Sequence, residues 1–224
     1  MMRASITKSA AIKTPPQSSG SLPADPVKLI KPFILLAGLY PAARMAWAIA
    51  YDPGSLGANP AEVIEHGMGD WCLQFLLLTL AVSPLRRLSG WNWPIKFRRM
   101  LGLFALFYGV LHLAAYIAFD RYFDIAAIAK DIVKRPFITV GMAALLLMTP
   151  LAVTSTRGWI KRLGGKRWNN LHQLIYPIAV LGVVHYWWLV KRDITWPVIY
   201  GAILMALFAV RLGFRLVKKA RRNS

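Results

Sequence analysis

The chain has 224 residues, of which 57% are hydrophobic, and its 28 lysines and arginines far outnumber its nine aspartates and glutamates. This apolar content is higher than that of a soluble domain. The single cysteine, Cys72, excludes an intramolecular disulfide and any iron–sulfur or zinc site built from cysteines. The composition therefore indicates a membrane protein.

The N-terminal segment differs from the rest of the chain. Residues 1–26, MMRASITKSAAIKTPPQSSGSLPADP, are rich in Ser, Pro, Ala and Lys and contain no apolar core. A secretory signal peptide would need such a core. We therefore expect a disordered tail over residues 1–26, a membrane domain over 27–215 and a short basic tail over 216–224.

Six apolar runs approach the roughly 20 residues that a helix needs to cross a bilayer. In chain order they are Leu29–Tyr51, Gly67–Ser83, Leu101–Phe119, Pro136–Val153, Leu171–Val190 and Trp196–Phe214. The second run is the shortest. The sequence therefore predicts an all-α membrane protein, a bundle of six transmembrane helices joined by short loops, with no soluble domain.

The basic residues are distributed unevenly between the two sides of this bundle. If the N-terminus is cytoplasmic, 21 of the 28 basic residues and one acidic residue lie on the cytoplasmic side. The opposite side then carries the other seven basic residues and eight acidic ones. This asymmetry follows the positive-inside rule, so we expect both termini in the cytoplasm of a bacterial inner-membrane protein. Contact with anionic membrane lipid is a secondary role for these charges, and nucleic acid is not an expected partner.

Two histidines in apolar runs are the main candidates for a cofactor site. His112 and His185 lie about 17 and 21 Å from the cytoplasmic ends of two parallel helices. Two imidazoles at similar depth suit the axial positions of a haem iron. The alternatives are hydrogen-bonded packing residues and a zinc site, which would require further ligands. We favour haem, with His112 and His185 as the metal ligands.

His172 and His66 each allow more than one role. His172 precedes His185 by 13 residues, roughly 20 Å along a helix, which suits a second haem nearer the cytoplasm. A straight helix would place the two rings on different faces, although Pro177 should kink it. His172 is thus a candidate iron ligand or a partner for a propionate or phosphate. His66 lies with Glu62, Glu65 and Asp70 at helical spacing, which fits a solvated helix entry better than a metal site.

Two predicted cytoplasmic loops combine basic residues with tryptophans. Topology and interfacial anchoring explain most of these residues. In addition, Arg98 and Arg99 begin the third predicted span, while Lys166, Arg167 and Trp168 precede the fifth. Arginines at a helix N-terminus favour a phosphate, and an indole can stack on a planar ring. A phosphorylated flavin would fit this combination.

Three segments together resemble a known family. They are RRMLGLFALFYGVLHLAAY, RPFITVGMAALLL and TSTRGWIKRLGGKRWNNLHQLIYPIAVLGVVHYWW. They resemble the MsrQ (YedZ) family, the haem-binding membrane subunits of a bacterial periplasmic methionine sulfoxide reductase system, within the ferric reductase-like transmembrane group. The resemblance covers about Leu29 to Phe214.

The resemblance implies electron transfer across the inner membrane. Members of the family take electrons from the quinone pool or a flavin reductase. They pass them through FMN and haem b to a soluble periplasmic molybdopterin subunit, which reduces methionine sulfoxide in damaged proteins. By position, the functional histidines of the family map to His112, His172 and His185, and its FMN-associated arginines map to Arg98 and Arg99. One or two haems are compatible with this set.

Two other functions stay open. A ferric reductase-like cytochrome b would need a separate partner that oxidises NAD(P)H, because this chain contains no flavin and nicotinamide domain. A small membrane transporter would tend to show broken helices or paired charges at the midplane, and neither is clear in the sequence.

Overall fold

The computed structural model describes residues 26–223, and every regular element among them is a helix. The longer helices are α1 (Pro26–Tyr51), α2 (Pro60–Ser89), α3 (Arg98–Ala115), α5 (Pro136–Val153), α8 (Ile175–Leu189) and α9 (Thr195–Asn223). The shorter ones are α4 (Ile125–Lys134), α6 (Arg157–Leu163), α7 (Gly165–Leu171), the 3-10 turns η1 (Pro53–Leu56), η2 (Trp93–Phe97) and η4 (His172–Leu174), and the π-helical turn η3 (Tyr116–Asp120). The predicted all-α class is confirmed for this part of the chain. The predicted tail lies outside the described residues except for Pro26, which begins α1.

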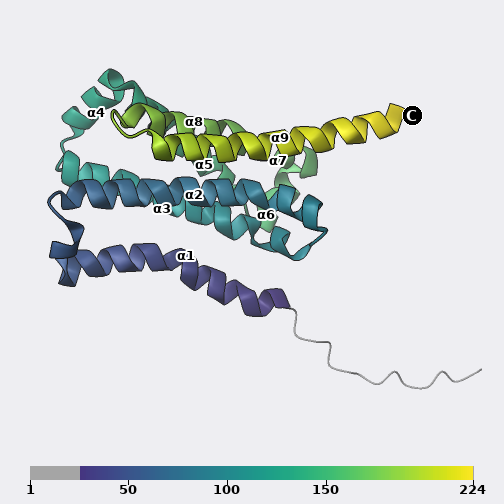
Figure 1. Cartoon of the computed structure of the whole chain (residues 1–224), viewed down its shortest axis with the longest axis horizontal. Coiled ribbons are helices and arrows are strands. Elements are labelled where there is room, and N and C mark those ends of the chain that lie inside the picture. The colour runs from purple at the N-terminus through teal and green to yellow at the C-terminus, as the bar shows by residue number, and fades with distance from the viewer. Residues whose placement is uncertain (1–25, 224) are drawn as a thin grey trace, which may run out of the picture.

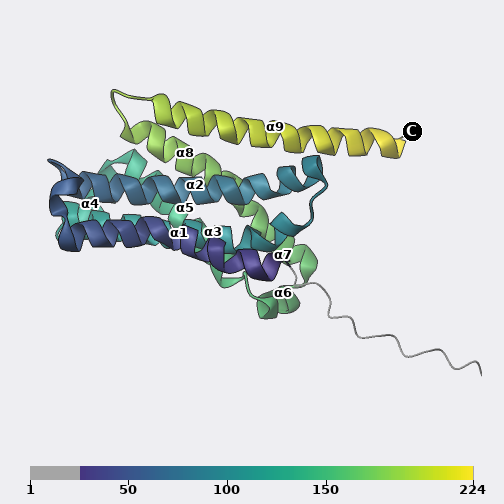
Figure 2. The ribbon, with the colours of Figure 1, turned by 60° about the horizontal axis from the view of Figure 1, so that its bottom comes forward.

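The long helices run side by side along one axis of the molecule (Figures 1 and 2). Helix α4 lies at one end of the bundle, and α6 and α7 lie at the other. Helix α1 begins and α9 ends at the end that carries α6 and α7. The chain therefore enters and leaves the described bundle on the same side.

Within residues 26–223, five segments are long and apolar enough to cross a membrane, so the chain is a multi-pass membrane protein. They are Val27–Tyr51, Pro60–Ser89, Trp93–Asp120, Pro136–Val153 and Thr195–Arg221. Helix α8 has only 15 residues. At roughly 22 Å it is shorter than the hydrocarbon core of about 30 Å. Six spans therefore stay a prediction, in which α8 and the turn before it form the fifth.

The second predicted span needs a correction. Gly67–Ser83 was expected to be the shortest, but α2 has 30 residues and is the longest helix among the described residues. It begins at Pro60, where the Asn59 side chain accepts a hydrogen bond from the Glu62 N–H, and it ends at Ser89, just before Gly90, whose φ is +75°. The polar residues of its first turns do not interrupt the helix; they only lie outside the apolar run that the sequence shows.

The far end of the described chain is helical. Helix α9 continues to Asn223, so the four basic residues of the predicted tail belong to this helix, and a separate tail from 216 onward stays a prediction. No break marks residue 216.

The core of the bundle lies between α2, α3, α5, α8 and α9. Tyr108, Leu80 and Ile178 are fully buried there. Tyr108 also fixes α1, because its hydroxyl donates to the Gly38 carbonyl (2.7 Å) and accepts from the Ala42 N–H (3.2 Å). The hydroxyl thus inserts into one rung of the α1 hydrogen-bond ladder, a recognised cause of helix bending.

An arginine on α9 completes the hydrogen bonding of α2. Pro84 lies inside α2 and has no N–H, so the Leu80 carbonyl lacks its usual partner four residues later. Arg211 donates one Nη2 hydrogen bond to this carbonyl and one Nη1 hydrogen bond to the Tyr176 hydroxyl (2.9 Å). Its guanidinium also lies 5.2 Å from the centre of the Tyr176 ring. Arg211 therefore ties α9 to both α2 and α8.

This arrangement predicts a coupling between Arg211 and Pro84. Arg211→Met should lower the stability of the purified protein by about 1–3 kcal/mol, because it leaves the Leu80 carbonyl unpaired. Pro84→Ala restores the main-chain N–H that bonds this carbonyl, so Arg211→Met should cost clearly less in that background. Denaturation of the four proteins in detergent measures the coupling. Equal losses in the two backgrounds would contradict it.

Candidate functional site

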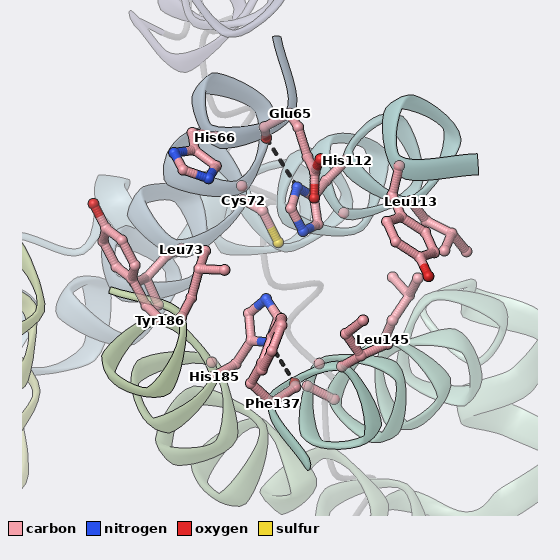
Figure 3. Close-up of a pocket in the computed structure, with 18 of the residues that line it drawn as sticks. Glu65, His66, Cys72, Leu73, His112, Leu113, Phe137, Leu145, His185 and Tyr186 are labelled. Atoms are coloured by element: carbon pink, nitrogen blue, oxygen red, sulfur yellow. Dashed lines mark hydrogen bonds between the residues drawn. The ribbon is translucent and has the colours of Figure 1, made fainter. Parts of the chain in front are cut away.

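Helices α2, α3, α5 and α8 enclose a cavity of about 370 Å³. Its walls are mostly apolar and include Leu73, Leu76, Met148 and Ile178. The volume lies in the range typical of sites for small ligands and cofactors, roughly 300–1,000 Å³. Figure 3 shows the histidines and their neighbours around this space.

His112 of α3 and His185 of α8 project into this cavity from opposite walls (Figure 3). Their ring centres are 6.0 Å apart and their planes are inclined by 78°. A metal ion between two imidazoles needs two metal–nitrogen bonds of about 2 Å, and each nitrogen lies about 1.1 Å from its ring centre. The two centres should then be roughly 6 Å apart. The observed spacing fits one metal ion held from both sides.

Backbone carbonyls fix the orientation of both rings. The Nδ1 atom of His112 lies 2.9 Å from the Glu65 carbonyl oxygen, and that of His185 lies 2.6 Å from the Phe137 carbonyl oxygen. A carbonyl only accepts, so each Nδ1 carries the hydrogen and donates it. Each neutral ring then keeps the lone pair on Nε2, the form in which histidine binds metals.

These two imidazoles fit the axial positions of a haem better than a zinc site. Zinc sites in proteins use three or four protein ligands. Within residues 26–223 no three His, Cys, Asp or Glu side chains are grouped so that they could hold a metal ion. Two opposed nitrogens in an apolar cavity suit an iron whose other four ligands come from a macrocycle.

Polar residues gather at the end of the cavity nearest α4. Glu65, His66, Asp70, Asp120 and Arg135 line it there. His66 is 41% exposed, and its Nδ1 lies 4.0 Å from a Glu62 carboxylate oxygen. The structure thus places His66 in the solvated first part of α2, as expected. Among the described residues, no set of three possible metal ligands surrounds it.

His172 lies outside this cavity, at the end of α7. Its Nε2 is 3.1 Å from the Thr154 hydroxyl, and its ring stacks on Trp168 with centres 4.0 Å apart. The Trp168 indole N–H also donates to the Thr154 carbonyl (2.8 Å). The structure therefore pairs His172 with a tryptophan and a threonine, and it does not bring another histidine to it within the described part of the chain.

The helix that was expected to join His172 to His185 is not continuous. The chain forms the 3-10 turn η4 at His172–Leu174, and α8 begins only at Ile175. The break lies just before Pro177, whose ring disfavours helix in the preceding turn. The argument that a straight helix would place these two rings on different faces therefore does not apply.

The predicted arginine pair, Arg98 and Arg99, lies at the end of the bundle opposite α4. Arg98 begins α3, is half-buried and lies near enough to His172 and Arg211 for its positive charge to oppose a positive charge on either. Arg99 is exposed. The loop predicted before span five instead contains α6 and α7, and α7 carries Lys166, Arg167 and Trp168. The structure thus brings Arg98, Trp168 and His172 into one neighbourhood.

Sequence reasoning missed the groups that orient the two cavity histidines. They are main-chain carbonyls of Glu65 and Phe137, whose function does not depend on the side chain at those positions. Two glycines that lie against the rings, Gly69 and Gly141, were also missed. No motif marks them, because the contact joins neighbouring helices that are distant in the sequence.

Comparison with known proteins agrees with this architecture. A family model for the ferric reductase like transmembrane component matches residues 67–183, from α2 into α8. A protein of Herminiimonas arsenicoxydans is 52% identical over 88% of this chain and 90% of its own length. Proteins of Azospira oryzae and Rhodospirillum rubrum are 54% and 53% identical over 87% of this chain and 81% and 93% of their own lengths. All three relatives are named protein-methionine-sulfoxide reductase heme-binding subunit MsrQ. The chain therefore belongs to the MsrQ family, within the ferric reductase-like transmembrane group.

Proposed function

We propose that this chain is the haem b electron-transfer subunit of a methionine sulfoxide reductase system. The observation that carries the proposal is the pair of opposed Nε2 atoms of His112 and His185 in an apolar cavity. The names of the relatives, which describe heme-binding subunits of such a reductase, support it. Haem b, when bound, supplies a centre that accepts and donates one electron.

The residues of the chain have distinct tasks in this proposal. His112 and His185 would hold the haem iron, and the Glu65 and Phe137 carbonyls keep both rings in the tautomer and orientation that this needs. The apolar walls contributed by α2, α3, α5 and α8 surround the two rings with hydrocarbon side chains. The geometry favours one haem at this pair.

We propose FMN at the other end of the bundle. Arg98 at the start of α3 and the neighbouring Arg99 would hold the phosphate, and the half-buried Trp168 supplies a planar surface close by. His172 is stacked on Trp168 and lies near Arg98, so we propose it as a cofactor-binding residue for this phosphate rather than as the ligand of a second iron.

The flavin proposal predicts the behaviour of the arginine pair. Arg98→Ala combined with Arg99→Ala should lower FMN bound per protein at least tenfold while leaving the haem spectrum nearly unchanged. The reason is that the loss of two charge-assisted hydrogen bonds weakens the binding of the FMN phosphate and does not affect the haem site. Flavin fluorescence after denaturation measures the content. Lys218→Ala with Lys219→Ala removes the same charge at the same end and serves as the control. Equal FMN in both double variants would leave Arg98 and Arg99 with a role in topology only.

We further propose that the protein crosses the bacterial inner membrane six times, with both termini in the cytoplasm. The 21-to-7 division of basic residues supports this orientation. The start of α1 and the end of α9 lie at one end of the bundle (Figure 1), which requires an even number of crossings. Helix α8, the fifth span in chain order, then supplies the one crossing that the five long segments lack. In this orientation the histidine cavity is nearer the periplasm.

Electrons would enter from the quinone pool or a flavin reductase and leave to a periplasmic molybdopterin methionine sulfoxide reductase. The test uses the purified protein in detergent, chemically reduced under nitrogen, and the soluble catalytic subunit. The reduced haem signal should decay only when both the catalytic subunit and methionine sulfoxide are added. A signal that persists with both present, but decays with ferric citrate, would favour a ferric reductase-like cytochrome instead.

A further inference from the structure

Each of the two cavity histidines forms a hydrogen bond with a main-chain carbonyl of a neighbouring helix. His112 of α3 donates to the Glu65 carbonyl of α2, and His185 of α8 donates to the Phe137 carbonyl of α5. In an α-helix, a carbonyl also accepts from the N–H four residues later. The residue at that position is glycine in both cases, Gly69 in α2 and Gly141 in α5.

Both glycines lie directly against the imidazole rings. A Cβ atom added at Gly69 would be 3.1 Å from Nδ1 and 3.3 Å from Cε1 of His112. A Cβ atom added at Gly141 would be 2.7 Å from Nδ1 and 2.8 Å from Cε1 of His185. Real Cβ contacts essentially never fall below 3.0 Å. A side chain at Gly141 must therefore displace the ring, and one at Gly69 must press against it.

Other helical glycines of the chain differ from this pair. A Cβ atom at Gly201 would be 3.7 Å from Val183 and one at Gly102 would be 3.7 Å from Thr79, which are ordinary contacts. Gly38 and Gly109 are tightly packed, but against Phe104 and against Leu145 and Cys72. Only Gly69 and Gly141, among the glycines that the structure describes, have a cavity histidine as their nearest neighbour.

We propose that Gly69 and Gly141 are positioning residues for the two haem ligands. The missing side chain lets each ring edge reach the carbonyl one turn earlier, and the resulting Nδ1–H···O=C bond directs Nε2 into the cavity. This bond also makes the imidazole a stronger donor to iron, which stabilises the oxidised form and lowers the reduction potential. The proposal rests on the function proposed above for His112 and His185.

The test compares Gly69→Ala, Gly141→Ala and the control Gly201→Ala, which lies where α9 packs on α8. Haem per protein, the low-spin signal of six-coordinate iron and the midpoint potential are measured on each purified protein. Gly141→Ala should lose most of the low-spin signal. Gly69→Ala should keep its haem with a midpoint potential shifted to more positive values, and Gly201→Ala should match the parent.

A second background separates a displaced ligand from a misfolded protein. In His185→Gly, added imidazole can take the place of the side chain and is free to move away from a new methyl group. Gly141→Ala should therefore reduce haem binding much less in this background than in the parent. A loss of equal size in both would overturn the proposal.

The failure of this inference is distinguishable from failure of the proposed function. If the parent protein binds no haem, the proposed function fails before any glycine is changed. If the parent binds haem and both Gly141→Ala and Gly69→Ala keep its spin state and midpoint potential, the glycine proposal alone is wrong.

Discussion

His112→Ala and His185→Ala should each remove the same haem signal, and the double variant should lose little more. Each substitution deletes one of two axial bonds to one iron, so the site becomes five-coordinate or empty. Residues that act on one centre are not additive. The Soret band and the low-spin signal of the purified variants measure the effect, and we expect each single change to abolish the six-coordinate form.

His66→Ala and His172→Ala are the matched controls, because they remove the other two histidines of the chain. His66→Ala should leave the haem signal unchanged. His172→Ala should alter flavin content instead, because His172 contacts Thr154 and Trp168 outside the cavity. If His112→Ala left the spectrum intact while His172→Ala and His185→Ala abolished it, the pairing proposed here would be wrong.

Asp131→Ala should lower stability by about 2–3 kcal/mol, because it leaves two partly exposed arginines and the Tyr116 hydroxyl without their shared acceptor. The Asp131 side chain is buried on α4 and forms an ion pair with Arg121. It also accepts from the Tyr116 hydroxyl (2.8 Å) and lies 3.3 Å from Nε of Arg135. Tyr116 and Arg135 line the cavity that contains His112 and His185, so haem content should fall together with stability.

Thermal denaturation in detergent measures this loss, and Asp124→Ala supplies the control. Asp124 directly precedes the same short helix, and its exposed side chain caps the N-terminus by accepting from the Ala127 N–H (3.0 Å). Losing such a cap costs about 1 kcal/mol. Similar melting temperatures for the two variants would show that the ion-pair cluster around Asp131 is dispensable.

Apolar runs predicted the membrane helices well where the helix and the run coincide. Pro136–Val153 is both a predicted span and the whole of α5. The apolar run gave the wrong start for α2. The helix extends beyond the apolar run through polar residues such as Glu62 and His66, which give no hydrophobic signal. The π turn at Tyr116–Asp120 and the short helix α4 were also missed, since both depend on contacts around Asp131.

For the candidate site, the sequence was enough to predict how deep each histidine lies along its helix. Similar positions on two parallel spans were enough to place His112 and His185 opposite one another. The level of His172 was also readable, but its stacking on Trp168 was not, because the 3-10 turn at His172–Leu174 changes the direction of the ring. The carbonyls of Glu65 and Phe137 and the glycines that expose them require the packing of α2 on α3 and of α5 on α8, which sequence periodicity does not contain.

The absorption spectrum of the purified protein, oxidised and then reduced with dithionite, tests the central claim most directly. The His112–His185 pair predicts a Soret band that shifts on reduction, sharp bands of a low-spin b-type haem, and about one haem per chain. A protein that is folded in detergent, expressed with ample haem supply and still shows no Soret band would contradict the account.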